Sequence, residues 1–389
     1  MTDTLALLED SATVASAFAE HAAEADRAGE FPEADLASLR GSGLLGVMVP
    51  ERLGGPGATF AQYARVAMTL AGGSGASALV FNMHASVTGA LAHTPDALAR
   101  ALGAPESYFV ARDALLGDAL DGSFFAVAMS EHGGGARLSA MTTAYAVTDG
   151  GFAIQGSKAF VSGALLADRY LVAARASDDP KRVSYFIVPA GRGVVVEPTW
   201  DAMGMRGTGS HDVHFDAVVP ARALLGGVEG LALLIAQLMP QWLVASYAAV
   251  YVGVARSSID AAVREVRARA LDRLPAVRAR IGRADAAVAA AEFAVLDAAE
   301  RIDRAPGEVE TNRSVYRAKL LAGVTAFEVA ASMLEACGAS ATRKGHHLER
   351  LYRDARCGSL QPATSDVCAD WLGLATLGLD PDAAETPRW

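Results

Sequence analysis

The chain has 389 residues, of which 52% are hydrophobic and 20% are charged, and its formal net charge is −10 at pH 7. Such a composition belongs to a folded protein with room for two or three domains, so disorder is excluded as a description of the whole chain. Acidic residues outnumber basic ones, and the chain has no basic stripe that could bind a phosphate backbone. Nucleic acid is therefore not an expected partner.

Alanine-rich segments with a helical spacing of apolar residues dominate the first part of the chain. They cover residues 5–28, 33–42, 60–70 and 76–92. Gly41, Gly43 and the glycine–proline run at 54–57 interrupt them. We predict an N-terminal helical domain over residues 1–118. The chain begins with an early Asp3 and has no basic stretch ahead of an apolar core, so we expect no secretory signal.

Short β-branched and aromatic runs follow. They are residues 124–128, 143–147, 170–173, 183–188 and 213–215. Turn residues separate them at 149–151 (DGG), 162–163 (SG) and 191–193 (GRG). Strands this short and evenly spaced predict a small antiparallel barrel or sandwich over residues 119–225. They argue against a parallel sheet with helical crossovers.

Three longer segments with helical spacing occupy the rest of the chain, at residues 231–270, 275–302 and 312–336. Their lengths predict a four-helix bundle over residues 226–389. The expected fold class is therefore α+β and mostly α. It has an N-terminal helical domain, a middle β-barrel or sandwich, and a C-terminal helical bundle.

One stretch, residues 230–255, contains no charged residue and is long enough to cross a bilayer. It includes Gln237, Pro240 and Gln241, and a charged amphipathic segment follows it. A helix that is apolar on every side is also typical of the centre of a large helical bundle. We expect the buried helix and no membrane association.

The three cysteines, Cys337, Cys357 and Cys368, lie near the C-terminus without CxxC spacing. An odd number of cysteines without such spacing favours reduced thiols over a disulfide or a metal site. We therefore expect a cytoplasmic protein that binds no metal.

Five segments, met in order along the chain, resemble the acyl-CoA dehydrogenase superfamily of flavoproteins. They are residues 43–51 (GLLGVMVPE) with Gly54-Gly55, residues 129–131 (MSE) ahead of a glycine cluster, residues 156–163 (GSKAFVSG), residues 203–208 (MGMRGT) leading to 215–220 (FDAVVP), and residues 348–356 (LERLYRDAR). Each segment alone is weak evidence, but together they span nearly the whole chain. The resemblance implies the same three-part fold, a flavin cofactor (FAD, with FMN as the other choice), and a homodimer or homotetramer.

The glycine cluster is part of residues 130–135 (SEHGGG), which directly follow a predicted strand. Glycines there let backbone N–H groups approach a ligand closely, although the pattern alone would indicate only a loop. The resemblance implies that Met129 and Ser130 donate hydrogen bonds to the flavin. It also implies that Phe160 stacks on the ring and that Ser162 hydrogen-bonds to it.

Near the C-terminus, Thr364 and Asp366 stand where the superfamily's threonine and acidic residue meet the cofactor. Pro362, however, occupies the position of the glutamate that removes the substrate α-proton in most of its dehydrogenases. That proton is weakly acidic, so its removal needs a well-placed base. The alternative position for the base falls on Leu243, with Gln241 as the nearest polar residue, and neither side chain can take a proton.

The positions that contact coenzyme A in the superfamily also differ. A serine, an aspartate and an arginine are common there, and this chain has Ala136, Arg137 and Val244. The Arg-x-Gln-Phe-Gly element with which a neighbouring subunit holds the adenine dinucleotide is missing between Arg264 and Pro275. This loss weakens the case for permanently bound FAD.

This chain keeps the residues expected to contact the flavin ring but lacks the catalytic base and the coenzyme A contacts. In this respect it resembles a second branch of the superfamily, the two-component monooxygenases. These proteins take reduced flavin from a separate reductase and use O2 to oxidise a small aromatic, amine or amino-sugar substrate in a dry pocket. The sequence therefore favours a monooxygenase of a small organic substrate, with a flavin reductase as partner.

His84 is the candidate catalytic acid–base group, because histidine titrates near neutrality and the superfamily places this helix at the substrate pocket. A hydrogen-bonded core histidine is the alternative.

Two other functions stay open. Dehydrogenation of an acyl group on coenzyme A or an acyl carrier protein would require a relocated base. Oxidised FAD that bleaches with an acyl thioester would favour it. A non-catalytic structural homologue would bind flavin in neither redox state, and the retained Ser130, Phe160 and Thr364 argue against it.

Overall fold

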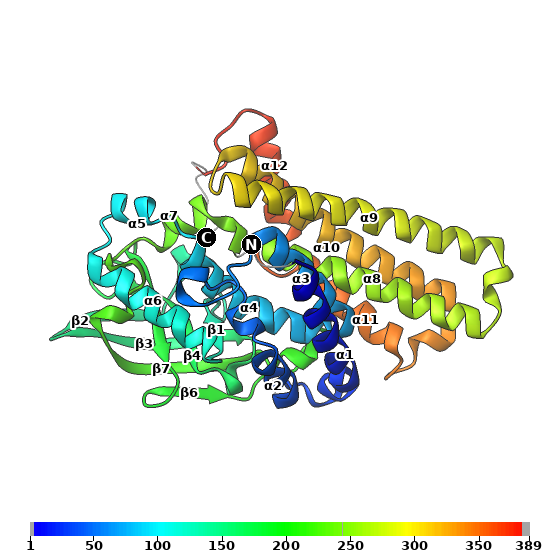
Figure 1. Ribbon diagram of the computed structural model, residues 1–389, viewed down its shortest axis with the longest axis horizontal. Helices are drawn as coiled ribbons and strands as arrows, with labels where there is room; N and C mark the ends of the chain where they lie inside the picture. Colours follow the sequence, from blue (N-terminus) through cyan, green and yellow to red (C-terminus); the bar gives the residue numbers. More distant parts are fainter. Residues whose placement is uncertain (1–3, 243, 383–389) are drawn as a thin grey trace.

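Helices precede and follow a mixed β-sheet in the computed structural model, which describes residues 4–242 and 244–382, and the sheet lies along one side of the molecule (Figure 1). The N-terminal part is helical, as predicted. Its helices are α1 (Thr4–Ala28), α2 (Glu33–Gly41), α3 (Phe60–Gly73), α4 (Gly75–His93), α5 (Asp96–Ala101) and α6 (Glu106–Leu120). Helices α5 and α6 are not among the predicted helices, because α5 is short and α6 has no clear apolar face.

The middle part forms a seven-stranded sheet with the order β1-β4-β2-β3-β7-β6, and β5 pairs with β4. The strands are β1 (Phe125–Ala128), β2 (Ala144–Thr148), β3 (Gly151–Val161), β4 (Arg169–Ala176), β5 (Val183–Pro189), β6 (Val194–Glu197) and β7 (His211–Pro220). Both β1 and β2 run parallel to β4. The prediction of an all-antiparallel arrangement is wrong for these pairs, because the chain makes the β2–β3 hairpin before it returns as β4.

Strands β3 and β6 are not among the predicted strands. β3 carries Gly156 and Lys158 in its interior, and a charged residue there contradicts the pattern of a half-buried strand. Lys158 is nevertheless only 1% exposed. β3 pairs with β7 along most of its length, and Phe160 lies where that pairing is irregular, between the paired residues Lys158 and Val161.

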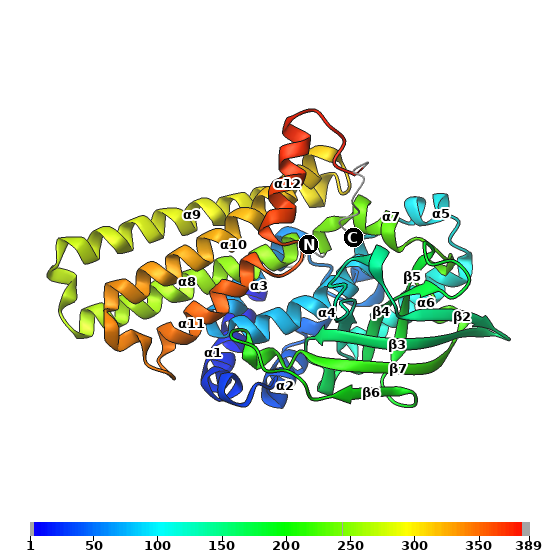
Figure 2. The ribbon, with the colours of Figure 1, turned by 180° about the vertical axis from the view of Figure 1, so that it is seen from behind.

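The C-terminal part is helical. Its helices are α7 (Ala232–Leu238), α8 (Ala245–Ala268), α9 (Pro275–Arg304), α10 (Val309–Cys337), α11 (His347–Arg356) and α12 (Ser365–Thr376). α8, α9 and α10 lie side by side as long antiparallel rods, with α11 beside α8 and α12 against α10 (Figures 1 and 2). The expected single helix over residues 231–270 is broken, because Pro240 begins a short 3-10 turn between α7 and α8.

The uncharged stretch is buried where α8 begins, since nearly every residue from 245 to 255 is covered. This confirms the prediction of a buried helix. Within the described residues, α10 is long and apolar enough to cross a membrane, with 44% of its most apolar window buried. Core helices of helical bundles pass the same test, and α10 packs against α8, α9, α11 and α12.

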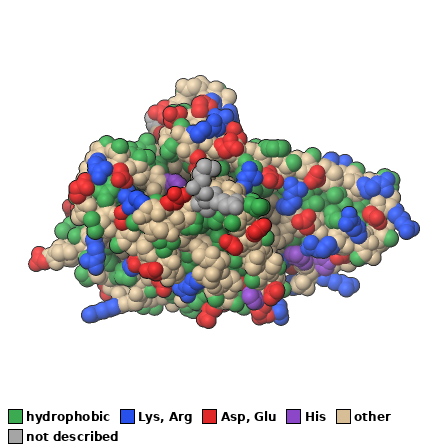
Figure 3. All heavy atoms as spheres, in the orientation of Figure 1, with side chains coloured by type: hydrophobic (Ala, Val, Ile, Leu, Met, Phe, Trp, Pro, Cys, Tyr) green, Lys and Arg blue, Asp and Glu red, His purple; other side chains and the backbone are tan. Residues whose placement is uncertain are grey.

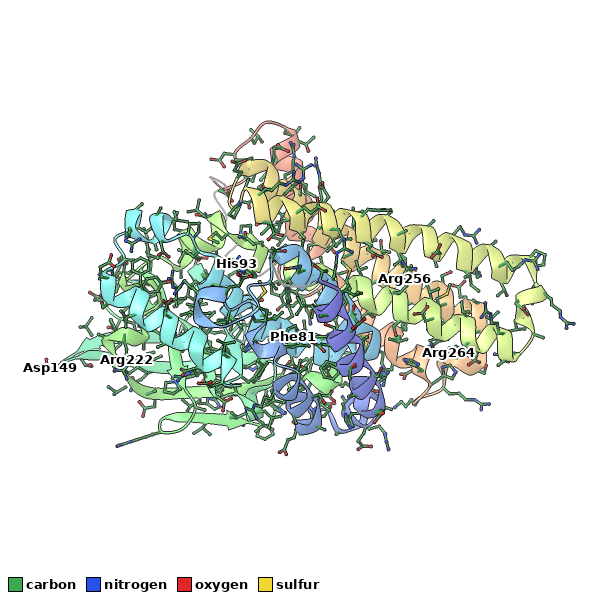
Figure 4. All side chains as sticks on the ribbon, in the orientation of Figure 1. Phe81, His93, Asp149, Arg222, Arg256 and Arg264 are labelled. Atoms are coloured by element: carbon green, nitrogen blue, oxygen red, sulfur yellow. The ribbon has the colours of Figure 1, made fainter. Side chains whose placement is uncertain are left out.

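α4 joins the sheet to the bundle. It contacts β1, α3 and α8, and almost all of its residues are buried, including Phe81, which Figure 4 labels at the centre of the molecule. A helix covered on every side needs apolar or small side chains all round. The main cavity of the molecule opens where α4, the sheet and α8 meet.

Candidate active site

A cavity of about 450 Å³, here called the main cavity, lies between α4, the ends of β1 and β3, residues 200–210, α8 and the loop after α11. A second cavity of about 600 Å³, the outer cavity, adjoins it and extends to the start of α12. Ser130, Phe160 and Pro362 line both. Volumes of roughly 300–1,000 Å³ are usual for pockets that bind small organic ligands.

All six residues expected to bind the cofactor line these cavities. Met129, Ser130, Phe160 and Ser162 are in the wall of the main cavity. Thr364 and Asp366 are in the wall of the outer cavity, together with Ser130 and Phe160. The structure thus brings together residues that are up to 237 positions apart along the chain. Their individual contacts with a cofactor stay predictions.

The glycine loop closes on itself at the mouth of the two cavities. Glu131 and Gly135 exchange two backbone hydrogen bonds of 2.9 Å. Gly133 and Gly135 have φ angles of 81° and 63°, which favour glycine. A Cβ atom at either position would have no neighbour within 4 Å, so this face of the loop is open.

A buried ion pair ties the glycine loop to β3. Lys158 Nζ donates to Glu131 Oε1 at 2.8 Å, and the same carboxylate accepts hydrogen bonds from Thr142 and Thr143. Burial opposes ionisation of Glu131, but the Lys158 charge and these hydrogen bonds outweigh it and lower the pKa of Glu131 to about 2. Burial lowers the pKa of Lys158 to about 8, so both groups are charged at pH 7. The pair joins the glycine loop to β3 next to Ser130 and two residues before Phe160.

Phe160 is held in an unusual conformation. Its φ is 59°, a left-handed value that is uncommon outside glycine, and its side chain is 55% exposed at the cavity wall. The ring meets Trp200 edge-on, with centroids 6.1 Å apart. The preceding residue, Ala159, donates its backbone N–H to Ser130 O at 2.8 Å. An exposed aromatic in a strained conformation is typical of functional sites, where surrounding contacts fix it.

A buried lysine shapes the opposite wall. Lys319 of α10 donates to the carbonyl oxygens of Gly358, Gln361 and Ala363, at 2.8, 3.1 and 3.0 Å. Burial lowers the pKa of Lys319 to about 8. Tyr251 of α8 adds a hydrogen bond of 2.7 Å to the Gln361 side chain. Lys319 is not among the predicted site residues, because a single lysine within an apolar helix carries no local signal.

The loop at residues 201–206 forms a third wall, and α11 anchors it. Arg353 donates to Met203 O at 2.9 Å and pairs with Asp26 of α1. Asp354 accepts the Met205 backbone N–H at 2.6 Å. Burial raises the pKa of Asp354 to about 6, against a usual 3.8. The contact that holds this loop to α11 therefore includes a titratable group.

We expect Asp354→Asn to change how stability depends on pH. Because the pKa of Asp354 is raised in the folded state, its contribution is complete below pH 3.8 and is lost as the pH rises through about 6. Asparagine keeps an acceptor oxygen and does not titrate. Relative to the wild type, the variant should therefore gain roughly 2 kcal/mol in free energy of unfolding between pH 4 and pH 7. Urea unfolding at both pH values measures this, with the exposed Asp121→Asn as control, and parallel pH profiles would contradict it.

His84 does not line either cavity. It is fully buried, its Nε2 lies 2.7 Å from Leu45 O, and its Nδ1 accepts the Phe125 backbone N–H at 3.1 Å. Burial lowers its pKa to about 4. Both ring nitrogens are engaged by backbone groups, so the structure does not support the predicted acid–base role. The alternative, a hydrogen-bonded core histidine, describes what is observed.

The structure describes two of the three positions considered for a catalytic base. Pro362 lines the main cavity. Gln241 is 1% exposed and is not part of the cavity wall. Leu243 lies outside the described residues. Among the described residues that line the main cavity there is no carboxylate, histidine, lysine or arginine. Its polar groups are hydroxyls, amides, a thiol and an indole, including Tyr247 of α8, whose hydroxyl has the Met83 sulfur at 3.4 Å.

Comparison with known proteins agrees with this architecture. Family models describe residues 6–101 as the N-terminal domain, 126–218 as the middle domain and 230–370 as the C-terminal domain of acyl-CoA dehydrogenases. The L-evernosamine nitrososynthase of a Micromonospora species is 30% identical over 93% of this chain and 87% of its own length. This chain belongs to the acyl-CoA dehydrogenase family. A putative acyl-CoA dehydrogenase of Bacillus subtilis is 27% identical over 92% of this chain and 93% of its own.

Among solved structures, the dibenzothiophene monooxygenase TdsC of Paenibacillus sp. A11-2 has been determined alone and with FMN. The FMN-bound form is 26% identical, with a TM-score of 0.82 over 96% of this chain and 97% of its own. Family membership confirms the three-part fold and the superfamily that the sequence motifs indicated.

The cavity walls of this chain suit a flavin on their own geometry. A planar, uncharged ring system fits a lining that has no charged side chain within the described part of the main cavity. The exposed Phe160 ring offers a surface for stacking, and Ser130 and Ser162 offer hydroxyl groups. Ser162 is oriented by Ser210 at 2.9 Å, which in turn contacts Thr208 at 2.7 Å.

Proposed function

We propose that this chain is a flavin-dependent monooxygenase that oxidises a small organic substrate with O2 and reduced flavin. One observation carries the proposal. The main cavity has no acidic or basic side chain in its described wall, although it is the site where a dehydrogenase of this family would need a base. Its family includes proteins that are named as a monooxygenase and a nitrososynthase.

The residues of this chain would contribute binding, orientation and exclusion of water. Phe160 and Trp200 would bound the ring, and Ser130 and Ser162 would hold its polar edge. Burial raises the pKa of Tyr247 well above its usual value, so its phenol stays protonated and can donate a hydrogen bond to a substrate. A bound reduced flavin supplies the electrons that activate oxygen. The apolar wall keeps water from the reacting groups.

Dehydrogenation of an acyl thioester is the second candidate, and the Bacillus relative named as a putative acyl-CoA dehydrogenase favours it. This reaction requires a base beside the α-carbon. Asp366 and Asp370 are the carboxylates among the described residues that line the outer cavity, and they are candidates for this base. Neither of them lines the main cavity.

A single set of measurements separates the two reactions. Purified protein is mixed anaerobically with reduced FMN or FAD and then with air, and oxygen consumption is followed with and without a flavin reductase. The monooxygenase predicts tight binding of reduced flavin and oxygen uptake only when reduced flavin is supplied. Tightly bound oxidised FAD that bleaches on addition of an acyl thioester would overturn the proposal in favour of the dehydrogenase. Failure to bind either redox state would leave a non-catalytic protein.

We expect Phe160→Ala to weaken flavin binding by about tenfold, which is the effect of losing one aromatic contact of roughly 1.4 kcal/mol. Fluorescence quenching of FMN measures the change. Phe293→Ala is the matched control, because Phe293 is also exposed, at 75%, but lies on α9 and outside both cavities. Equal affinity in the two variants would remove Phe160 from the site.

A further inference from the structure

The start of β7 lies beside the part of β3 that carries Phe160. β7 itself lies between β3 and β6 (Figure 2). His211 of β7 is paired with Val161 of β3, and the register then shifts before Lys158, so that Phe160 falls within the shift. Irregular pairing of this kind re-aims a side chain and is common beside active sites. The first two residues of β7, His211 and Asp212, are therefore next to the point where the sheet presents Phe160 to the main cavity.

Two rings flank Phe160 at the cavity wall, and β7 holds both of them. Trp200 meets Phe160 at an interplanar angle of 87°, and the imidazole of His132 on the glycine loop has its centroid 6.0 Å from that of Phe160. Asp212 Oδ2 lies 2.7 Å from His132 Nε2. His211 Nδ1 accepts the Trp200 backbone N–H at 3.2 Å. Adjacent residues of one strand thus hold both neighbours of Phe160.

His211 is a buried histidine whose two ring nitrogens have different partners. It is 2% exposed, whereas other histidine side chains reach the surface at several places in Figure 3. Its Nδ1 accepts the backbone N–H groups of Thr199 and Trp200, both at 3.2 Å. Because these backbone nitrogens carry hydrogens, Nδ1 has none, and a neutral ring carries its proton on Nε2. Nε2 faces Glu30, between α1 and α2, whose carboxylate oxygens are 3.1 and 3.0 Å away.

The far end of the Trp200 side chain is held as well. Its indole Nε1 donates to Arg206 O at 2.9 Å. Arg206 in turn donates through Nε to Asp26 O of α1 at 2.8 Å, so this end is attached to the N-terminal helices. Contacts at the backbone and at the far end of the ring leave the indole little freedom to turn. His211 therefore sets the position of the backbone from which the Trp200 ring reaches Phe160.

We propose that His211 is a positioning residue of the flavin wall. It holds the backbone of Trp200, and the Trp200 ring keeps Phe160 in the orientation on which a flavin ring stacks. The inference rests on a flavin lying against Phe160, as in the proposed function. Stacking needs neither electrons nor O2, so flavin affinity alone tests the role of His211, whatever reaction follows.

Two substitutions of His211 separate its two contacts. Asparagine puts an amide oxygen where Nδ1 stands and still accepts from Trp200, whereas glutamine puts its amide where Nε2 stands and keeps only the contact with Glu30. FMN titration of the full chain should give His211→Gln about tenfold weaker binding, the scale of one aromatic contact, and His211→Asn an affinity close to that of the wild type. His214→Gln is the matched control, because His214 also lies on β7 and pairs with a carboxylate, that of Glu197, but lines neither cavity.

A double-mutant cycle shows whether the effect passes through Trp200. Adding His211→Gln to Trp200→Ala should cost no further affinity, because the ring that His211 positions is already gone. Additive losses would overturn the inference, and so would a loss in His211→Asn equal to that in His211→Gln. Circular dichroism and thermal unfolding confirm that the variants are folded. Selective ¹⁵N labelling of histidine in the wild type needs no folded variant of His211, and a ring proton on its Nδ1 would contradict the inference.

The outcomes also distinguish this inference from the proposed function. Equal FMN affinity in the wild type, His211→Gln and Trp200→Ala would exclude the role of His211 and leave a flavin protein. Affinities in the expected order, without oxygen uptake when reduced flavin is supplied, would support the role of His211 and overturn the monooxygenase. A wild type that binds flavin in neither redox state would overturn both.

Discussion

Replacing Lys158 with methionine should lower the free energy of unfolding by about 3 to 5 kcal/mol, because it leaves the Glu131 charge buried without its partner. Lys158 and Glu131 are 0% and 5% exposed in their side chains. Flavin binding should fall with stability, since the pair joins the glycine loop to β3. Equilibrium unfolding in urea, together with FMN titration, measures both effects. The exposed Lys181→Met removes the same charge from a surface turn and is the control.

The double variant Glu131→Gln/Lys158→Met tests the cause. If the loss arises from an uncompensated charge, the double variant should be more stable than the Lys158→Met single variant. Because the pKa of Glu131 is about 2 in the folded state, against a usual 4.5, the contribution of the pair is complete above pH 4.5 and is lost as the pH falls through about 2. A single variant as stable as the wild type, or strictly additive losses, would exclude a coupled ion pair.

Lys319→Met should have the second largest effect. The substitution keeps the length of the side chain but removes the donor of three hydrogen bonds to the loop between α11 and α12. Each buried carbonyl left without a partner costs about 1 to 3 kcal/mol, while relief of the buried charge offsets part of the loss. We expect a net decrease of about 2 to 4 kcal/mol in the free energy of unfolding.

The same variant should also weaken flavin binding, because the loop that Lys319 holds forms a wall of both cavities. Proteolysis of the native protein offers an independent measurement, and cleavage near residues 357–363 should become faster in Lys319→Met than in Lys181→Met. Unchanged proteolysis together with unchanged flavin affinity would show that the loop is held by its other contacts, such as the bond from Tyr251 to Gln361.

The sequence brings together residues that the structure places around one cavity, while their contacts with a cofactor stay a prediction. Met129, Ser130, Phe160 and Ser162 were found because they lie in short motifs whose order resembles one superfamily, and the structure places all four around one cavity. His84 was misjudged for a physical reason. A histidine on an apolar helix has the same sequence pattern whether its nitrogens face a pocket or two backbone groups, and only the packing of α4 on β1 distinguishes them.

The groups that hold the site in place could not be predicted in the same way. Lys158 and Lys319 are buried cations, and sequence patterns assign lysine to the surface by default. A partial signal existed for Lys158, because Glu131 and Lys158 stand in two motifs that flank the expected flavin. No comparable signal exists for Lys319, whose three acceptors are backbone carbonyls about 40 residues away in sequence.

The sequence by itself determined the helical, β and helical order of the chain, its buried uncharged segment and its family. These features depend on local periodicity and on short motifs, which can be recognised without knowledge of the fold. Only the tertiary structure decided the parallel pairing of β1 with β4, the ion pair beneath the glycine loop and the contacts of Lys319 with the loop between α11 and α12. Each of these depends on contacts between residues distant in sequence, and their free energy is set by burial that no local pattern records.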